Sequence, residues 1–254
     1  MTAHSSLLIE ALDAYRGIVC AVGAGGKKSV LYQLVREHAG HIALTTTVHM
    51  TEFPEDLQVE RVVDDETMLR ERVLVAARSG SVAYACPSKK AGRYSGVPPE
   101  TIRSIHEEGG FDASFVKADG ARMRWIKAPE EGEPLLVQGA DIVIPVVSAR
   151  AIGEPLGERV AHRIEHVAAV TGVAPGNLLT PDAVGRLLAS DAGALQGTAG
   201  ARVAPIINMV DNDRQEELAR AAATAAIEMT SRFDRVVLCC LRRSTNPVVA
   251  VVTR

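Results

Sequence analysis

The chain has 254 residues, of which 47% are hydrophobic and only 4% aromatic, and its formal net charge is −3. This length suits one large α/β domain with an aliphatic core, while the mixed charges argue against nucleic acid as a partner. No signal peptide is recognisable and no apolar run reaches the roughly 18 residues of a membrane span, so we expect a cytoplasmic protein that binds no membrane.

Strand-like and helix-like segments alternate along the whole chain. Strands are expected at residues 17–22, 41–46, 59–63, 81–86, 113–118, 141–147, 203–208, 234–240 and 248–252. Helices are expected at residues 27–39, 65–78, 98–108, 160–170, 180–190 and 212–230, and flexible loops at 87–99 and 191–202. The alternation predicts a doubly wound, mostly parallel sheet between two layers of helices, formed by residues 1–254 as a single domain. Ligands of such sheets bind beyond the carboxyl ends of the strands.

The first predicted strand runs into a glycine-rich turn at the start of a helix. This arrangement is typical of a phosphate-binding loop, in which backbone N–H groups and the helix N-terminus hold phosphate and a lysine reaches the outer phosphates. We predict that a nucleotide, ATP or GTP, contacts the following residues: Gly23, Ala24, Gly25, Gly26, Lys27, Lys28 and Ser29. An ordinary glycine-rich turn is the alternative.

The match to the pattern G-x-x-x-x-G-K-[S/T] is incomplete. With Gly26 and Lys27 as its Gly-Lys pair, Ala21 stands at the first glycine and Lys28 at the hydroxyl that normally ligates Mg²⁺. A register shifted by one residue places Lys27 at the required glycine, so the first register is preferred.

The second predicted strand ends in three threonines. Hydroxyls at a strand terminus bind phosphate, metal or an attacking water, so Thr46 and Thr47 are candidate catalytic residues. Threonine is also common within strands, which leaves a structural role open.

The strand at 113–118 ends at Asp119, an arrangement similar to the Walker B element, whose carboxylate holds Mg²⁺. Asp119 is therefore a candidate for catalysis and, together with Ser29, for metal binding. Three cations follow, Arg122, Arg124 and Lys127, which either clamp phosphates or belong to a solvated loop. Of these, Arg122 is a predicted nucleotide contact.

A fourth motif follows the strand at 203–208. Asn208 and Asp211 are placed like the ends of the N-K-x-D element, in which the aspartate reads the base and the asparagine braces the loop, although Met209 replaces the lysine. We predict nucleotide contacts for Asn208 and Asp211, with capping of the next helix as the alternative.

Taken in order, the segments GAGGKKS (23–29), LTTTVHM (44–50), KADGARMRWIKAP (117–129) and PIINMVD (205–211) make the chain resemble the YqeC family of selenium-dependent hydroxylase accessory proteins. The resemblance implies a P-loop NTPase-like fold and a role in the maturation of molybdenum hydroxylases. The implied partners are a nucleotide, a molybdenum hydroxylase or its maturation factors, and a second copy of the chain in a homodimer.

The chain departs from that family pattern at two lysines. Lys28 stands where the family has threonine after Gly-Gly-Lys, and Lys117 where it has the glutamate of E-A-D-G. Both changes remove an oxygen that Mg²⁺ prefers and add positive charge beside the predicted phosphates, which predicts nucleotide binding with slow or metal-impaired hydrolysis. Alternatively, both lysines point to solvent and Ser29 or a threonine supplies the metal ligand. A non-hydrolysing module for a phosphorylated cofactor and a small-molecule kinase remain open as other functions.

Overall fold

A computed structural model describes residues 7–243 and 245–254 of the chain. Its larger sheet contains β1 (Gly17–Gly23), β2 (Ile42–Thr46), β3 (Met50–Thr51), β4 (Glu60–Val63), β5 (Val82–Pro87), β6 (Arg93–Ser95), β7 (Ala113–Lys117), β9 (Ile142–Ser148), β11 (Arg202–Val203), β12 (Ile206–Asn208), β13 (Arg235–Cys239) and β14 (Val248–Thr253). The helices are α1 (Leu8–Leu12), α2 (Lys27–Glu37), α3 (Glu66–Ala77), α4 (Pro99–Gly109), α5 (Ile164–Thr171), α6 (Pro181–Ala189) and α7 (Asp213–Met229), with a short 3₁₀ turn η1 (Ala149–Ala151).

The larger sheet has the order β14-β13-β12-β9-β1-β7-β2-β5-β6-β3, with β11 also beside β9 and β4 also beside β5. Its central strands are parallel, whereas β14, β6 and β3 run antiparallel to their neighbours towards the two ends of the sheet. The structure thus confirms the predicted mostly parallel α/β sheet.

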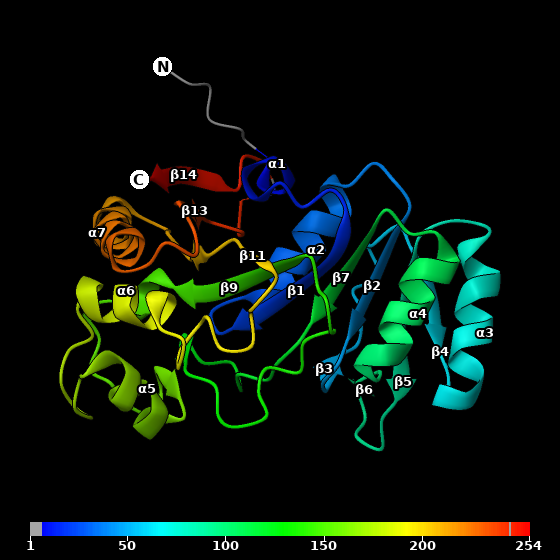
Figure 1. The fold of residues 1–254 in the computed structure, drawn as a ribbon, viewed down its shortest axis with the longest axis horizontal. Helices are drawn as coiled ribbons and strands as arrows, with labels where there is room; N and C mark the ends of the chain where they lie inside the picture. The colour runs from blue at the N-terminus through cyan, green and yellow to red at the C-terminus, as the bar shows by residue number, and fades with distance from the viewer. Residues whose placement is uncertain (1–6, 244) are drawn as a thin grey trace.

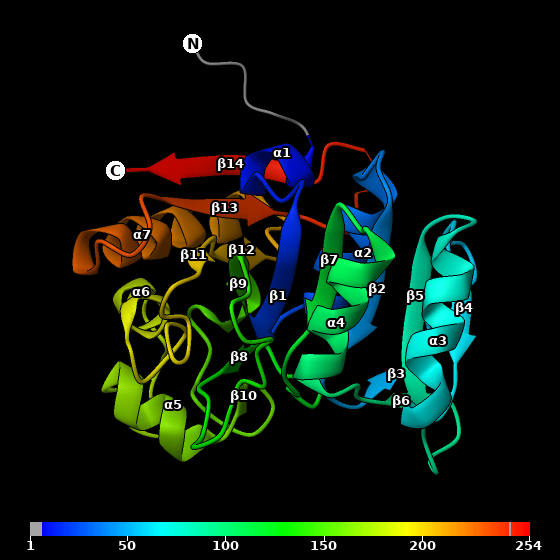
Figure 2. The same cartoon turned by 45° about the vertical axis from the view of Figure 1, so that its right-hand side comes forward.

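Helices cover both faces of this sheet (Figure 1). Successive side chains of a strand point to opposite faces, and those of β1 do so here. Val19 and Ala21 pack in one cluster with α1 and α2, whereas Ile18, Cys20 and Val22 pack in another with α3 and α4. The helices α5, α6 and α7 form a third cluster beyond β9 (Figure 2). Helices on both faces of the sheet confirm the predicted sandwich of three layers, helix, sheet and helix.

The structure corrects several predicted boundaries. The strand expected at 203–208 is divided into β11 and β12, because Pro205 stands opposite Pro145 of β9 in the register and neither residue donates an N–H to the ladder. The helix expected at 160–170 starts only at Ile164, since residues 161 and 162 form strand β10 (Ala161–His162) beside β8 (Ile126–Lys127). The loop expected at 87–99 contains β6.

The parallel strands bring three chain segments with predicted site residues to one edge of the sheet. The glycine-rich turn follows β1, which lies between β7 and β9; Asp119 follows β7, and Asn208 ends β12. Among the described helices, we find none that combines the length and the apolar character needed to cross a bilayer.

Candidate functional site

The turn between β1 and α2 is packed so tightly that two of its positions accept only glycine. Gly25 and Gly26 have φ angles of +91° and +122°, which L side chains rarely adopt. A Cβ atom on Gly26 would lie 2.3 Å from Nδ2 of Asn208, and one on Gly25 would lie 2.6 Å from the backbone nitrogen of Ser148. The glycines therefore hold the turn against the ends of β9 and β12.

Three N–H groups of the turn bond within the protein. Gly23 donates to Oδ2 of Asp119 at 2.9 Å, Ala24 to the Val146 carbonyl at 2.8 Å and Gly25 to the Arg124 carbonyl at 3.1 Å. This finding narrows the predicted set of phosphate donors, because these three N–H groups already have acceptors.

The backbone N–H groups in the first turn of α2 differ from those of Gly23, Ala24 and Gly25. The N–H groups of residues 26–29 have no protein acceptor in the part of the chain that the structure describes. Such N–H groups point along the helix axis and carry its partial positive charge, which makes them ready anion donors.

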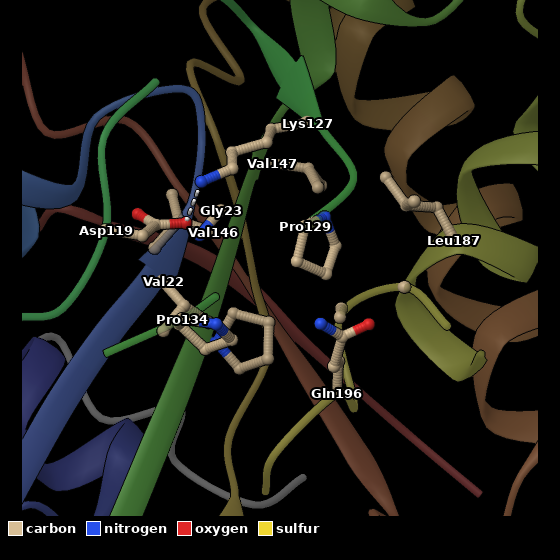
Figure 3. A pocket seen from close by; sticks show the side chains of 13 residues that line it. Val22, Gly23, Asp119, Lys127, Pro129, Pro134, Val146, Val147, Leu187 and Gln196 are labelled. Atoms are coloured by element: carbon tan, nitrogen blue, oxygen red, sulfur yellow. Dashed lines mark hydrogen bonds and ion pairs between the residues drawn. The ribbon is translucent and has the colours of Figure 1, made fainter. Parts of the chain in front are cut away.

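Asp119 is the centre of a buried ion-pair cluster. The Lys27 Nζ atom lies 2.8 Å from its Oδ1 and also donates to the Gly23 carbonyl, while the Lys127 Nζ atom lies 3.0 Å from its Oδ2. Figure 3 shows Lys127 reaching towards Asp119 beside Gly23. Burial lowers the pKa of Lys27, and the charge of Asp119 opposes that shift. Lys127 is buried, so its assignment to a solvated loop is wrong.

The cluster continues through residues that the sequence motifs did not indicate. Lys127 also contacts Oε2 of Glu133 at 2.6 Å, and Glu133 in turn lies 2.5 Å from Nη1 of Arg163. Burial alone would raise the pKa of Glu133, but the hydrogen bonds from Arg163 and Lys127 lower it to about 2. Only the basic residues at 122–127, followed by acidic residues at 130–133, hint at this network in the sequence. Arg122, the predicted nucleotide contact, is exposed on the loop after Asp119.

A small cavity lies behind Asp119 and Lys127. Its walls are largely apolar and include Pro129, Pro134 and Leu187 (Figure 3), and its volume of about 20 Å³ leaves room for about one water. A cavity of this size does not admit a phosphate group.

Lys117 lies on the α2 face of the sheet, because Phe115 two residues earlier packs in the cluster that contains α2. Only 7% of it is exposed, and its Nζ donates to the His49 carbonyl at 3.0 Å. Burial lowers the pKa of Lys117 to about 7, and the charge of Lys27 adds to the shift. The alternative in which Lys117 points to solvent is wrong.

Lys28 stands at the second position of α2 and is half-buried. Its Nζ donates to Oγ1 of Thr51 at 2.7 Å, and burial together with the charge of Arg93 lowers its pKa. Thr51 and Arg93 are cross-strand partners in the β3–β6 pair. Lys28 is thus tied to that pair of strands rather than extended into solvent.

The predicted catalytic hydroxyls bond to the backbone. Thr46 donates to the Val48 carbonyl at 2.7 Å, and Thr47 donates to the Leu135 carbonyl at 2.8 Å. Ser29 is exposed on α2, and in the described parts of the chain no hydrogen bond or ion pair joins it to Asp119. The catalytic roles of Thr46, Thr47 and Asp119 remain predictions.

The residues present do not fit a magnesium site. Both oxygens of Asp119 face ammonium groups, from Lys27 and Lys127, and Lys28 occupies the place of the expected hydroxyl. A hard divalent cation requires oxygen ligands and is repelled by such charges. Among the described residues there is also no group of three or more His, Cys, Asp or Glu side chains suited to a metal ion.

Asn208 braces the glycine-rich turn from β12. Its Nδ2 donates to the Gly25 carbonyl at 2.9 Å, and its Oδ1 accepts the Leu241 N–H at 3.4 Å. The predicted bracing of a loop by Asn208 is thus seen at the glycine-rich turn. Contact of Asn208 with a nucleotide stays a prediction.

Asp211 lies at the end of the same loop and is engaged by other residues. Its Oδ2 lies 2.5 Å from Nη2 of Arg150, and its Oδ1 accepts from Sγ of Cys240 at 3.2 Å. Asn212 next to it caps α7, as the capping alternative supposed, by accepting the Gln215 N–H at 2.9 Å. Base recognition by Asp211 remains a prediction.

Comparison with known proteins places this arrangement in a family. The family model described as YqeC protein matches residues 19–165, which include the glycine-rich turn, Lys117, Asp119 and Arg163. The chain belongs to the YqeC family. Over 171 residues it is 30% identical to Uncharacterized protein YqeC of Escherichia coli (strain K12). That match covers 65% of this chain and 62% of the relative, so it spans less than two thirds of the relative's length.

The YqeC-matched region contains the whole Asp119 cluster but ends before β12. The positions of Asn208 and Asp211 are therefore known from the structure of this chain and not from the family match. What the assembled residues can do is attract an anion: a helix N-terminus with open donors stands beside several ammonium groups and one neutralised carboxylate.

Proposed function

We propose that the chain is a nucleotide-binding accessory protein that holds the phosphates of ATP or GTP at the amino end of α2. The open N–H groups of residues 26–29 beside Lys27 are the observation that carries this proposal. Lys27 would exchange its contacts with Gly23 and Asp119 for a phosphate oxygen, and Lys127 would keep Asp119 neutralised meanwhile.

Slow hydrolysis is part of the proposal. Phosphoryl transfer in P-loop enzymes depends on a metal ion that neutralises the developing charge and on a group that orients the attacking water. Here Asp119 offers no carboxylate oxygen without an ammonium beside it, and the hydroxyls of Thr46 and Thr47 are donated to backbone carbonyls. Ammonium groups can hold the ground-state phosphates, but neither Asp119 nor the two threonines are positioned to activate water.

Isothermal titration of the full chain with ATP and GTP, with Mg²⁺ and with EDTA, tests the proposal. We expect binding of at least one nucleotide that is no weaker in EDTA, with slow turnover. Lys27→Met, which keeps the bulk of the side chain, should weaken binding at least tenfold, whereas Arg78→Met, at an exposed site before β5, should not. Lack of binding to either nucleotide by the wild-type chain would refute the proposal.

A non-hydrolysing carrier of a phosphorylated cofactor is the second candidate. The neutralised carboxylate of Asp119 favours it, because a carrier needs anion binding and no activated water. Mass spectrometry of the purified protein under native conditions distinguishes the two: a retained phosphorylated cofactor supports the carrier, and exchange with added ATP or GTP supports the nucleotide-binding protein.

Maturation of a molybdenum hydroxylase in the cytoplasm is the biological role that we propose, on the resemblance drawn from the sequence motifs. The nucleotide would change the loop after Asp119, where Arg122 and Met123 are exposed and have left-handed φ angles of 44° and 64°. Co-purification of the chain with a molybdenum hydroxylase or its maturation factors, compared with and without nucleotide, tests the role, and sedimentation tests whether the chain is a homodimer.

A further inference from the structure

Three cations next to the α2 turn form no ion pair with the residues that the structure describes. In the described parts of the chain, no carboxylate lies within ion-pair distance of Lys28, Lys117 or Arg93. Lys27 and Lys127, by contrast, share Asp119. The cations of this region therefore fall into a neutralised pair and an unpaired group of three.

The unpaired group includes a buried side chain. Lys117 is almost completely covered, yet among the described residues the hydrogen-bond partner of its Nζ is the His49 carbonyl and no carboxylate. Burying an ammonium without a counter-ion is costly, and buried charges in native proteins are normally paired with an opposite charge.

The three side chains come from different elements and converge. Lys28 projects from α2 to Thr51, whose cross-strand neighbour is Arg93, and the charges of Lys28 and Arg93 act on each other. Lys117 comes from β7 on the same face of the sheet as α2.

The charges that act on Lys117 come mostly from cations. Lys27 and Lys28 contribute from α2, Lys127 contributes from β8, and Asp119 at the end of β7 is the one carboxylate among them. A ligand with two or more negative charges would balance this excess of positive charge.

We propose that Lys117, Lys28 and Arg93 form a second anion subsite beside the amino end of α2, which binds the second phosphoryl group of a ligand with contiguous phosphates. The inference rests on the proposed function, because the first phosphate is held by the N–H groups of residues 26–29. The subsite takes the place of the metal ion that accompanies polyphosphates elsewhere, and the ligand class is a metal-free di- or triphosphate.

The test compares inorganic phosphate with pyrophosphate by isothermal titration of the full chain in EDTA. The wild-type chain should bind pyrophosphate at least about tenfold more tightly than phosphate, since the second group gains charge-assisted contacts. Lys117→Met should remove most of that advantage while phosphate affinity changes less than about threefold. Arg93→Met, at an exposed position, should act in the same direction without endangering the fold, and Arg78→Met serves as the control for net charge.

Each outcome has a separate meaning. Equal affinities for the two anions in the wild-type chain, or variants that weaken both anions equally, would overturn the second subsite and leave the proposed function intact. Failure of both anions and of ATP to bind would overturn the proposed function itself, and the subsite with it.

Discussion

The Nζ atom of Lys27 lies 2.8 Å from Oδ1 of Asp119, and both side chains are buried. The lysine that would contact a phosphate is therefore already paired, inside the protein, with the carboxylate that follows β7. Lys127 and the Gly23 N–H hold the other oxygen of Asp119. Anion binding at this site is thus a competition between a phosphate and Asp119 for one ammonium group.

Replacing Asp119 by asparagine should lower the stability of the fold but raise its affinity for anions. Asp119→Asn leaves Lys27 and Lys127 without their shared counter-charge, and breaking a buried pair costs about 3–5 kcal/mol. Affinity for phosphate should rise, by about tenfold, because the competitor is gone. Urea unfolding and phosphate titration measure the two effects. Asp56→Asn, which breaks an exposed pair with Arg36, should change the stability far less. Unchanged stability of Asp119→Asn would contradict the structure of the cluster.

The lowered pKa of Lys117 predicts a pH dependence of stability. Between about pH 7, its pKa in the folded chain, and the ordinary value of 10.5, the unfolded chain holds a proton that the folded chain has released. Stability therefore rises with pH through this window, and the cost of burying the ammonium is fully present below pH 7. Lys117→Met should raise the free energy of unfolding at pH 6, by on the order of 2 kcal/mol, and this gain should shrink towards pH 10.5. A difference between the two proteins that does not vary with pH would rule out the buried titration.

Lys117 also decides how the site responds to magnesium. In Lys117→Glu, a carboxylate two residues before Asp119 replaces a repelling ammonium and supplies a hard oxygen ligand. We expect ATP binding by the wild-type chain to be insensitive to Mg²⁺ and binding by Lys117→Glu to strengthen at least about tenfold when Mg²⁺ is added. Lys117→Met separates loss of the positive charge from gain of the ligand. Equal responses of Lys117→Glu and Lys117→Met to Mg²⁺ would show that the added carboxylate binds no metal.

Asn208 should stabilise the glycine-rich turn after β1, although the two lie some 180 residues apart in the chain. Asn208→Ala removes the donor to the Gly25 carbonyl and should destabilise the fold by about 1–3 kcal/mol, as expected when a buried acceptor loses its partner. Phosphate affinity should fall as the turn loosens. The exposed Asn177→Ala should change stability by less than about 0.5 kcal/mol. Equal unfolding free energies for Asn208→Ala and the wild-type chain would mean that Asn208 does not brace the turn.

The sequence predicted the sheet well because aliphatic strands and amphipathic helices alternate with little ambiguity. The errors fall where local pattern and tertiary pairing disagree. Pro205 looked compatible with one strand, and only its position opposite Pro145 shows why the ladder is interrupted there. The two-residue strands β8 and β10 carry no periodic signal at all and exist because they pair with each other.

The candidate site was predicted in its parts but not in its connections. Motif spacing brought the turn and Asp119 to the same edge of the sheet, as the structure shows. It could not reveal that Lys127 would turn inward to Asp119, because a basic loop and a buried ion pair have the same composition. Glu133 and Arg163 are 30 residues apart, and their pairing depends on the β8–β10 contact, which no local pattern encodes.

The most direct test is a crystal structure of the full chain grown with ATP and EDTA. The proposal predicts phosphate oxygens within hydrogen-bond distance of the N–H groups of residues 26–29, with the Lys27 ammonium withdrawn from the Gly23 carbonyl and Asp119 still bound to Lys127. Nucleotide bound at another face of the protein, or a Lys27 that keeps its pair with Asp119 while only water covers those N–H groups, would contradict it.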